Sequence, residues 1–458
     1  HGALPDLPSE LDGVTPIQSI EDVDVSGLGL GLWPRVISAG GTTAVLYATE
    51  TAPGGFTHDA DTPLGGTFTI VFLYSASGVR GTLTGFTVQD GNFVNIINEG
   101  AYDILDGDDM LIGGDGVDIL FGGFAGVDTY FGDGGIDGTV GDTFVVSSRD
   151  VGASSFTGTS NFTDTIKVID DINGFSTLNL RGATLSSINR IETDGNFVQI
   201  AAGQVNNGLS ASATVVTTTG TAGLGVFMAG TTTVDLSKFT IGAGVTVSVL
   251  GTAAAETITA TNGNDVLIPD QGTDTVNALG GNDLIYAVGT DSEFDAFNGG
   301  SGTDTIEAFG GDALVLDRFD AAAQSFEIFV AHGQGLLGNG NANTFNLAGL
   351  ATLTDLAAVD GMDGNDTITG SKFHDVLYGG DGEDTIGGGD DADDVAGGLG
   401  ADTMAGGAGG DFFDFGSTVE IGKKKGARDI ITDFAKGDRI DLSTIDAKGI
   451  GTAFKFKK

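Results

Sequence analysis

The chain has 458 residues, and its 63 Asp and Glu against 19 Lys and Arg give a formal net charge of −44 at pH 7. Nucleic acid is not an expected partner, because phosphates need a basic surface. Hydrophobic residues make up 40% of the chain, which excludes a disordered acidic tail. The absence of cysteine excludes disulfides, thiol catalysis and cysteine-based zinc sites.

Residues 1–100 contain alternating apolar positions but no clear repeat. Phe68, Ile70, Phe72 and Tyr74 alternate with their neighbours, which is the pattern of a β-strand. We therefore predict an N-terminal β-rich cap or docking region over residues 1–100. No apolar run in the chain approaches the roughly 18 residues of a membrane helix, so no membrane span is expected.

Three later blocks share a nine-residue repeat with the frame Gly-Gly-x-Gly-x-Asp-x-apolar-x. They cover residues 101–142, 257–307 and 361–414, and the third is the most regular. A short unit repeated in this way is typical of a solenoid. The repeat aspartates are Asp109, Asp118, Asp128 and Asp137 in the first block, Asp265, Asp274, Asp283 and Asp304 in the second, and Asp366, Asp375, Asp384, Asp393, Asp402 and Asp411 in the third.

Each nonapeptide is predicted to form a tight turn followed by a short strand, and two of them to form one coil. The glycines supply the left-handed conformations that the turn needs, and the apolar residue points inward. Ile368, Ile386 and Met404 should form one internal row, and a second row is expected at Leu377, Val395 and Phe413. This core is thin, because one apolar side chain per nine residues cannot offset an ordering cost of roughly 1–2 kcal/mol per residue.

Bound Ca²⁺ is the predicted source of the missing stability. Carboxylates and carbonyl oxygens are the hard ligands that Ca²⁺ prefers, at roughly 2.3–2.6 Å. We expect multiple Ca²⁺ ions between stacked turns, held by the repeat aspartates on two edges of the solenoid. Turn glycines are predicted to contribute to these sites, namely Gly380, Gly382, Gly398 and Gly400. Without metal, the stacked carboxylates repel one another and the blocks should unfold.

The segments between the blocks, residues 143–256 and 308–360, lack the aspartate repeat but echo one another. Leu178–Leu180 resembles Leu314–Leu316, and Asp90–Ile96 resembles Asp194–Ile200. We interpret both segments as calcium-poor β-solenoid. Separate β-sandwich inserts are the alternative.

The three blocks resemble the RTX (repeats-in-toxin) calcium-binding family. The resemblance implies an all-β fold, a right-handed parallel β-roll with Ca²⁺ in its turns. It also implies type I secretion from a Gram-negative cell and an extracellular or cell-surface location. Residues 429–447 look like the segment that follows the roll in serralysin-type proteins, so residues 415–458 are predicted to be a cap and secretion-associated segment. The basic stretch Phe454–Lys458 departs from that pattern.

No catalytic motif accompanies the repeats, and the chain is not expected to be an enzyme. His-Glu-x-x-His and Gly-x-Ser-x-Gly are absent, and His1, His58, His332 and His374 are isolated. The leading hypothesis is a secreted calcium-binding structural protein that self-associates into a surface layer or filament. The chain's alternation of calcium rolls with Thr-rich solenoid is similar in composition to RTX surface-layer proteins. The alternatives are an adhesin that binds cell-surface polysaccharide and, third, a β-helix enzyme acting on polysaccharide.

Overall fold

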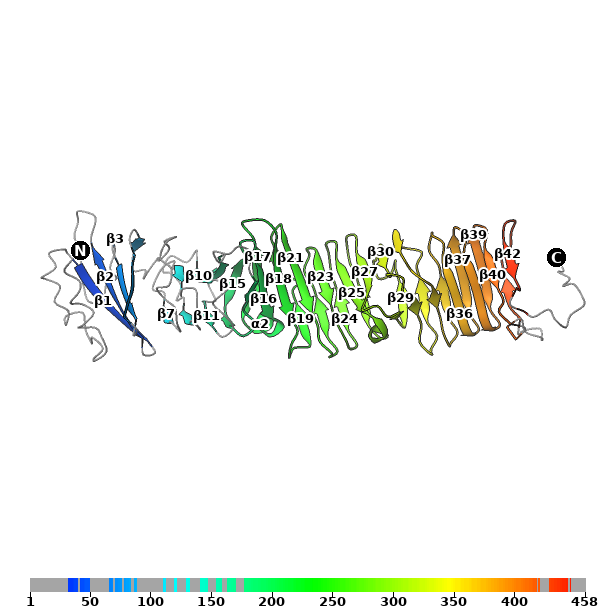
Figure 1. Ribbon diagram of the computed structural model, residues 1–458, viewed down its shortest axis with the longest axis horizontal. Coiled ribbons are helices and arrows are strands. Elements are labelled where there is room, and N and C mark those ends of the chain that lie inside the picture. The colour runs from blue at the N-terminus through cyan, green and yellow to red at the C-terminus, as the bar shows by residue number, and fades with distance from the viewer. Residues whose placement is uncertain are drawn as a thin grey trace, which may run out of the picture. The chain divides into compact units, whose positions relative to one another are not determined.

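The computed structural model describes strand backbones between residues 32 and 131 and, more fully, residues 141–146, 154–158, 163–169, 177–417, 419–420, 428–443 and 445 (Figure 1). Two compact units are present: His1–Phe227 with Lys238–Val247, and Met228–Ser237 with Ser248–Lys458. The described residues are nearly all strands, with helical structure only at α2 (Ala202–Asn207) and the 3₁₀ turn η3 (Gly289–Ser292). None of their helices has the length and apolar character needed to cross a membrane.

The first strands of unit 1 pair antiparallel, unlike those of the repeat blocks. β1 (Leu32–Ala39) pairs with β2 (Thr42–Thr49), β3 (Gly66–Phe68) with β6 (Phe86–Val88), and β4 (Val71–Ser75) with β5 (Gly78–Leu83). These strands agree with the β-strand pattern predicted within residues 1–100, and the bounds of the region stay a prediction. Its role as a cap or docking region stays a prediction.

The rest of unit 1 is built from parallel strands. One sheet contains, in order of neighbours, β20 (Thr240–Ile241), β17 (Leu209–Val216), β15 (Ile188–Glu192), β12 (Thr165–Val168), β10 (Thr143–Val146) and β8 (Ile119–Phe121). A second contains β14 (Thr184–Ser186), β11 (Ser155–Thr157), β9 (Thr129–Phe131) and β7 (Met110–Ile112). Also parallel are β13 (Thr177–Asn179), β16 (Phe197–Ala201) and β18 (Ala222–Phe227), and β21 is Val245–Leu250.

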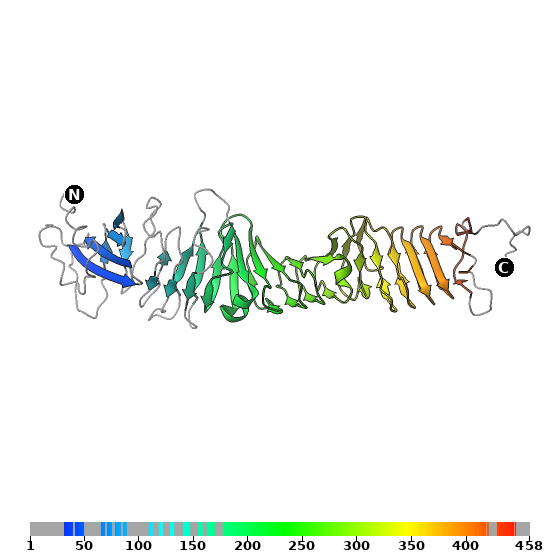
Figure 2. The same cartoon turned by 60° about the horizontal axis from the view of Figure 1, so that its bottom comes forward.

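Unit 2 stacks short parallel strands in the same manner (Figures 1 and 2). Its first part contains β19 (Thr233–Asp235), β22 (Thr257–Thr259), β24 (Thr275–Asn277) and β26 (Ala296–Asn298) in one sheet, and β23 (Asp265–Ile268), β25 (Leu284–Val288), β27 (Thr305–Phe309), β30 (Ile328–Val330) and β33 (Thr352–Thr354) in another.

Two facing sheets form the C-terminal part of unit 2. The first, here called the K sheet, contains β28 (Leu314–Val315), β31 (Leu336–Leu337), β34 (Val359–Asp360), β36 (Val376–Gly382), β38 (Asp394–Gly400), β40 (Phe412–Asp414) and β42 (Arg439–Asp441). The second, the L sheet, contains β29 (Arg318–Asp320), β32 (Thr344–Asn346), β35 (Thr367–Thr369), β37 (Thr385–Asp390), β39 (Thr403–Ala408) and β41 (Ile430–Ile431).

The register confirms both predicted internal rows. Ile368 lies beside Ile386, which lies beside Met404, and all three are buried. The second row is formed in the same way on the K sheet. Each strand therefore contributes one inward side chain per nonapeptide, and the predicted thin core of a parallel β-roll is present.

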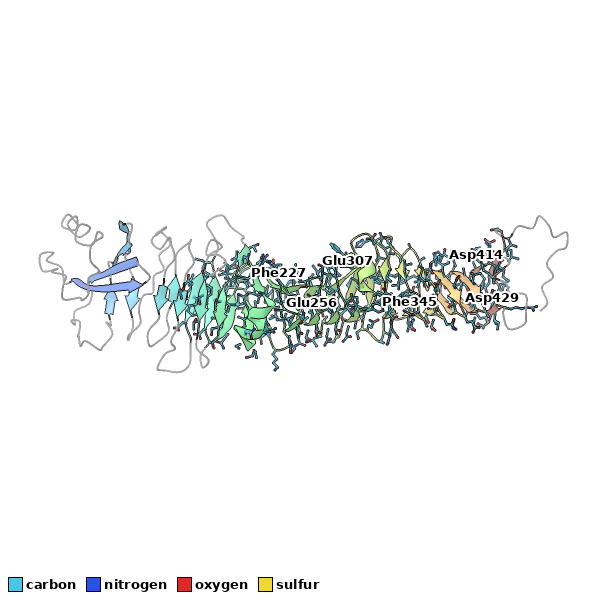
Figure 3. All side chains as sticks on the ribbon, turned by 90° about the horizontal axis from the view of Figure 1, so that it is seen from below. Phe227, Glu256, Glu307, Phe345, Asp414 and Asp429 are labelled. Carbon is cyan, nitrogen blue, oxygen red and sulfur yellow. The ribbon has the colours of Figure 1, made fainter. Side chains whose placement is uncertain are left out.

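Residues 308–360 continue the coils of the third block. β34 pairs in parallel with β36, and β32 pairs in parallel with β35. Larger inward side chains, including Phe319 and Phe345, fill the core here (Phe345 is labelled in Figure 3). This continuity agrees with the solenoid interpretation rather than with a separate sandwich. The exact segment boundaries stay predictions.

Candidate calcium-binding turns

The repeat aspartates of the third block form two ladders of hydrogen bonds along the roll. The backbone N–H of Asp366 donates to Oδ1 of Asp384 at 2.7 Å, and that of Asp384 donates to Oδ1 of Asp402 at 2.9 Å. On the other edge, the N–H groups of Asp375 and Asp393 donate to the carboxylates eighteen residues later, at 2.9 and 3.1 Å. The predicted separation of the aspartates onto two edges is confirmed by these bonds.

The second carboxylate oxygen of these aspartates lies buried without a hydrogen-bond partner among the described residues. The same holds in both described blocks, at Oδ2 of Asp283, Asp304, Asp366, Asp384, Asp393, Asp402 and Asp411 and at Oδ1 of Asp375. A buried carboxylate oxygen without a partner is strongly destabilising. A row of such atoms therefore fits a cation that coordinates them.

The glycines of the frame let the backbone approach these oxygens closely. A Cβ on Gly379 would lie 2.5 Å from Oδ2 of Asp384, and one on Gly397 would lie 2.5 Å from Oδ2 of Asp402. Gly380 and Gly398 adopt φ values of 106° and 92°, in the region that L side chains rarely adopt. The turn thus places carbonyl and carboxylate oxygens around a small space without side-chain obstruction.

Gly382 and Gly400 bring neighbouring coils into contact. A Cβ on Gly382 would collide with the carbonyl oxygen of Gly364, and one on Gly400 with the carbonyl oxygen of Gly382. The four predicted turn glycines are therefore required by the stacking, and their neighbouring carbonyls are available as hard oxygen ligands.

The second block repeats the ladder with an insertion. The N–H of Asp265 donates to Oδ1 of Asp283 at 2.8 Å, and that of Asp283 donates to Oδ1 of Asp304 at 2.9 Å, although the second pair is 21 residues apart. On the other edge, the N–H of Asp274 donates to Oδ1 of Asp295 at 2.7 Å. Inserting residues between turns therefore leaves the stacking intact.

A hydroxyl residue supports the first aspartate of two ladders. The backbone N–H and the hydroxyl of Thr261 both donate to the Asp265 carboxylate, at 2.9 Å. The backbone N–H of Ser371 donates to Oδ2 of Asp375 at 2.6 Å, and its hydroxyl donates to the same oxygen at 2.9 Å. Protein donors thus stabilise part of the negative charge at these two positions. Neither Thr261 nor Ser371 was predicted from the nonapeptide frame, although each stands four residues before its aspartate.

Burial dominates the electrostatics of the metal-free turns. It raises the pKa of Asp265 and Asp283 from 3.8 to about 7, and that of Asp384 to about 6. The pKa of Asp393 also rises to about 7, first through burial and further through the charges of Asp375 and Asp411. A divalent cation would remove this penalty by stabilising the ionised carboxylates.

The ladders extend beyond the predicted site residues. The N–H of Asp402 donates to Oδ1 of Asp429 at 3.1 Å, and that of Asp411 donates to Oδ1 of Asp438 at 3.2 Å. Asp429 and Asp438 are themselves nine residues apart, a signal that could have identified them. At the other end of the ladder, Asn343 occupies the position before Asp366. Its backbone N–H donates to Oδ1 of Asp366 at 2.6 Å.

The four predicted ligands of the first block, Asp109, Asp118, Asp128 and Asp137, lie outside the described residues. Within the described ranges, no group of three or more His, Cys, Asp or Glu side chains gathers into one metal-binding cluster. That arrangement is expected if backbone carbonyls supply much of the coordination. Two repeat carboxylates with turn carbonyls match the donor set of Ca²⁺.

Comparison with known families agrees with this geometry. The model of the RTX calcium-binding nonapeptide repeat matches four stretches, at residues 105–138, 250–286, 360–395 and 387–417. The chain carries RTX repeats. No curated protein matches the chain. Proteins with RTX repeats are typically secreted and bind calcium, and the orphaned carboxylate oxygens of this roll fit that ion.

The matched stretches overlap all three predicted blocks, although the second match begins at residue 250, before the predicted 257, and ends at residue 286, before the predicted 307. The RTX ladder nevertheless continues to Asp304 and on to Glu327, whose Oε2 accepts the N–H of Asp304 at 2.8 Å. The resemblance of residues 429–447 to a serralysin-type segment stays a prediction, as does the likeness to surface-layer proteins.

Proposed function

We propose that this protein is an extracellular structural component whose RTX rolls fold on Ca²⁺ outside the cell and which then assembles into a surface layer or filament. The observation that carries the proposal is the row of buried carboxylate oxygens without hydrogen-bond partners in both described blocks. At cytosolic calcium the repulsion among them favours an unfolded chain that a type I system of a Gram-negative cell can export. External calcium, at roughly millimolar concentration, then folds it.

Assembly is supported by the last strands of unit 2. β41 and β42 end the L and K sheets within the described residues. Ile430 on β41 is 56% exposed, and Phe434 between the two strands is 50% exposed. An open strand edge beside exposed apolar side chains is a pairing surface. We propose that it contacts residues 1–100 of another copy.

The calcium dependence can be tested on the full chain by circular dichroism. Chelation is expected to remove the part of the β-signal that the repeat blocks contribute and to make residues 361–414 sensitive to protease, and millimolar Ca²⁺ should reverse both changes. Mg²⁺ should not substitute, because it prefers octahedral sites with retained water. Identical spectra in chelator and in Ca²⁺ would contradict the proposal.

A further inference from the structure

A groove lies on the outer face of the K sheet, and the residues that line it include His374 and Ala392, which directly precede Asp375 and Asp393 of the calcium-binding turns. The register places Val376, Asp394, Phe412 and Arg439 in one outward row. The next outward row contains Tyr378 and Ala396, with Asp414 and Asp441 on the following strands. The small side chain of Ala396 leaves a hollow of about 540 Å³ between the larger side chains.

The equivalent positions of the L sheet carry no aromatic side chain. Thr385, Thr403, Gly387 and Ala405 are small, and Ile430 is the one large residue of these rows. On the K sheet, by contrast, Tyr378 is 42% exposed and Phe412 is 36% exposed. The outward face of the K sheet therefore combines aromatic side chains with the small Ala396, and this combination builds an aromatic hollow.

The groove is negatively charged. Asp394, Asp414 and Asp441 line it, and none of them takes part in the ion pairs of the described residues, whose cations are Lys167, Arg190 and His332. Oδ1 of Asp414, labelled in Figure 3, is buried without a hydrogen-bond partner. The groove therefore favours a positively charged occupant.

One of the two aromatic rings of the groove, that of Phe412, already contacts a cationic side chain. The guanidinium carbon of Arg439 lies 5.1 Å from the centre of the Phe412 ring, within cation–π range. No described cation lies over the Tyr378 ring. An occupant with both aromatic and cationic side chains would complete the groove.

The chain itself contains such a segment. Phe454-Lys455-Phe456-Lys457-Lys458 alternates aromatic and cationic residues and carries three of the 19 basic residues of a chain with net charge −44. We propose that residues 454–458 bind in the groove on the K sheet of the same molecule, with their phenylalanines over Ala396 and their lysines beside Asp394 and Asp414.

The connection permits this contact within one chain. Phe454 follows Asp441, which lines the groove, after thirteen residues, a stretch that spans up to about 45 Å when extended. Such a short tether gives an effective concentration on the order of millimolar. Phe454 and Phe456 would lie about 7 Å apart along an extended strand, and two strand spacings put Tyr378 and Phe412 about 10 Å apart.

Because the chain lacks cysteine, engineered thiols can test the contact in the full-length protein in Ca²⁺. Ala396→Cys is combined with Ala453→Cys, and the control combines Ala405→Cys with Ala453→Cys. Ala396 and Ala405 are nine residues apart, occupy the same repeat position, are similarly part-exposed, and lie on opposite sheets. We expect an intramolecular disulfide to form about tenfold faster at position 396, a difference worth about 1.4 kcal/mol.

Two further variants test the chemistry of the contact. Asp394→Asn, or Lys455→Glu with Lys457→Glu, should reduce that preference, and so should high salt, because the charges are solvent-accessible. Should Ala396→Cys disturb the roll, judged by circular dichroism in Ca²⁺, Val376→Cys with Thr385→Cys as control offers the same comparison and keeps the Asp394 carboxylate. Equal rates at the two sheets, or covalent dimers in place of a cross-linked monomer, would overturn the proposal. Monomer cross-linking is independent of the assembly proposed above.

Discussion

At the scale of the residue, the two oxygens of Asp384 and of Asp402 have different roles. Oδ1 accepts the backbone N–H of the aspartate one coil earlier, so it joins consecutive coils. Oδ2 of both residues is buried and has no hydrogen-bond partner among the described residues. The nine-residue spacing predicted which aspartates stack, because register follows from the repeat. It could not predict which oxygen is orphaned, since that depends on side-chain rotamers within the folded turn.

Replacing Asp384 with alanine should weaken calcium-induced folding strongly. The change removes the acceptor of the Asp366 N–H and one predicted Ca²⁺ ligand in the middle of the third block. Loss of a charge-assisted hydrogen bond costs about 1.5–3 kcal/mol, so the calcium midpoint should rise by at least about tenfold. Asp312→Ala, at an exposed aspartate of the calcium-poor segment, is the control in a calcium titration followed by circular dichroism. Equal midpoints for the two variants would contradict the stacked register.

The raised pKa values predict opposite effects of pH with and without calcium. The pKa of Asp393 is 3.8 normally and about 7 in the metal-free roll, so the folded state binds more protons than the unfolded state between these values. Stability of the metal-free roll should therefore be greatest at low pH and fall as pH rises from about 4 to 7.

In calcium-free buffer, lowering the pH from 8 to 5 should increase the β-signal. In calcium, the same change should raise the calcium midpoint, because protons compete for the carboxylates. Both can be measured by circular dichroism. A calcium midpoint that does not move between pH 8 and pH 5 would mean that these aspartates are not the ligands.

At the scale of the element, the turn conformation persists where its glycine is replaced. Asp270 and Asp391 adopt φ values of 68° and 72°, and aspartate tolerates this region better than most residues. Met362 and Leu279 adopt 71° and 72° at corresponding places, at some cost in strain. In the sequence, Pro269-Asp270 stands in place of the Gly-Gly pair of the frame, and Asp391 stands in place of its third glycine. The sequence did not reveal that the backbone keeps a positive φ at Asp270 and Asp391.

The glycines of one coil should therefore differ sharply in their tolerance of alanine. A Cβ at Gly382 would collide with the Gly364 carbonyl oxygen, whereas a Cβ at Gly387 meets nothing within 4 Å. We expect Gly382→Ala to destabilise the calcium-bound roll by about 1–3 kcal/mol through overpacking, and Gly387→Ala to change it by less than about 0.5 kcal/mol. Urea unfolding in millimolar Ca²⁺ would measure both. Equal stabilities would show that the coils are not in close contact at Gly382.

At the scale of the whole molecule, the repeat predicted the parallel β-roll because its period fixes both strand length and stacking. The continuation through Asp429 and Asp438 was missed because these residues follow Asp402 and Asp411 by 27 residues, instead of the 18 that separate Asp384 from Asp402. The groove on the K sheet was also missed. It depends on outward side chains of four strands becoming neighbours, which no local pattern shows.

The ends of the roll give the last prediction, which concerns self-association. The charge of −44 opposes contact between copies until Ca²⁺ neutralises part of it, so light scattering of the full chain should rise with calcium. Ile430→Lys places a charge on the exposed edge of β41 and should reduce the rise. Phe309→Lys adds the same charge at a 55% exposed position on β27, which is not among the last strands of the sheets, and should have little effect.

Head-to-tail contacts between unlike ends give filaments unless they close into a ring, so negative-stain microscopy should show one or the other. A chain that folds in calcium but stays monomeric at high concentration would exclude the filament and favour an adhesin.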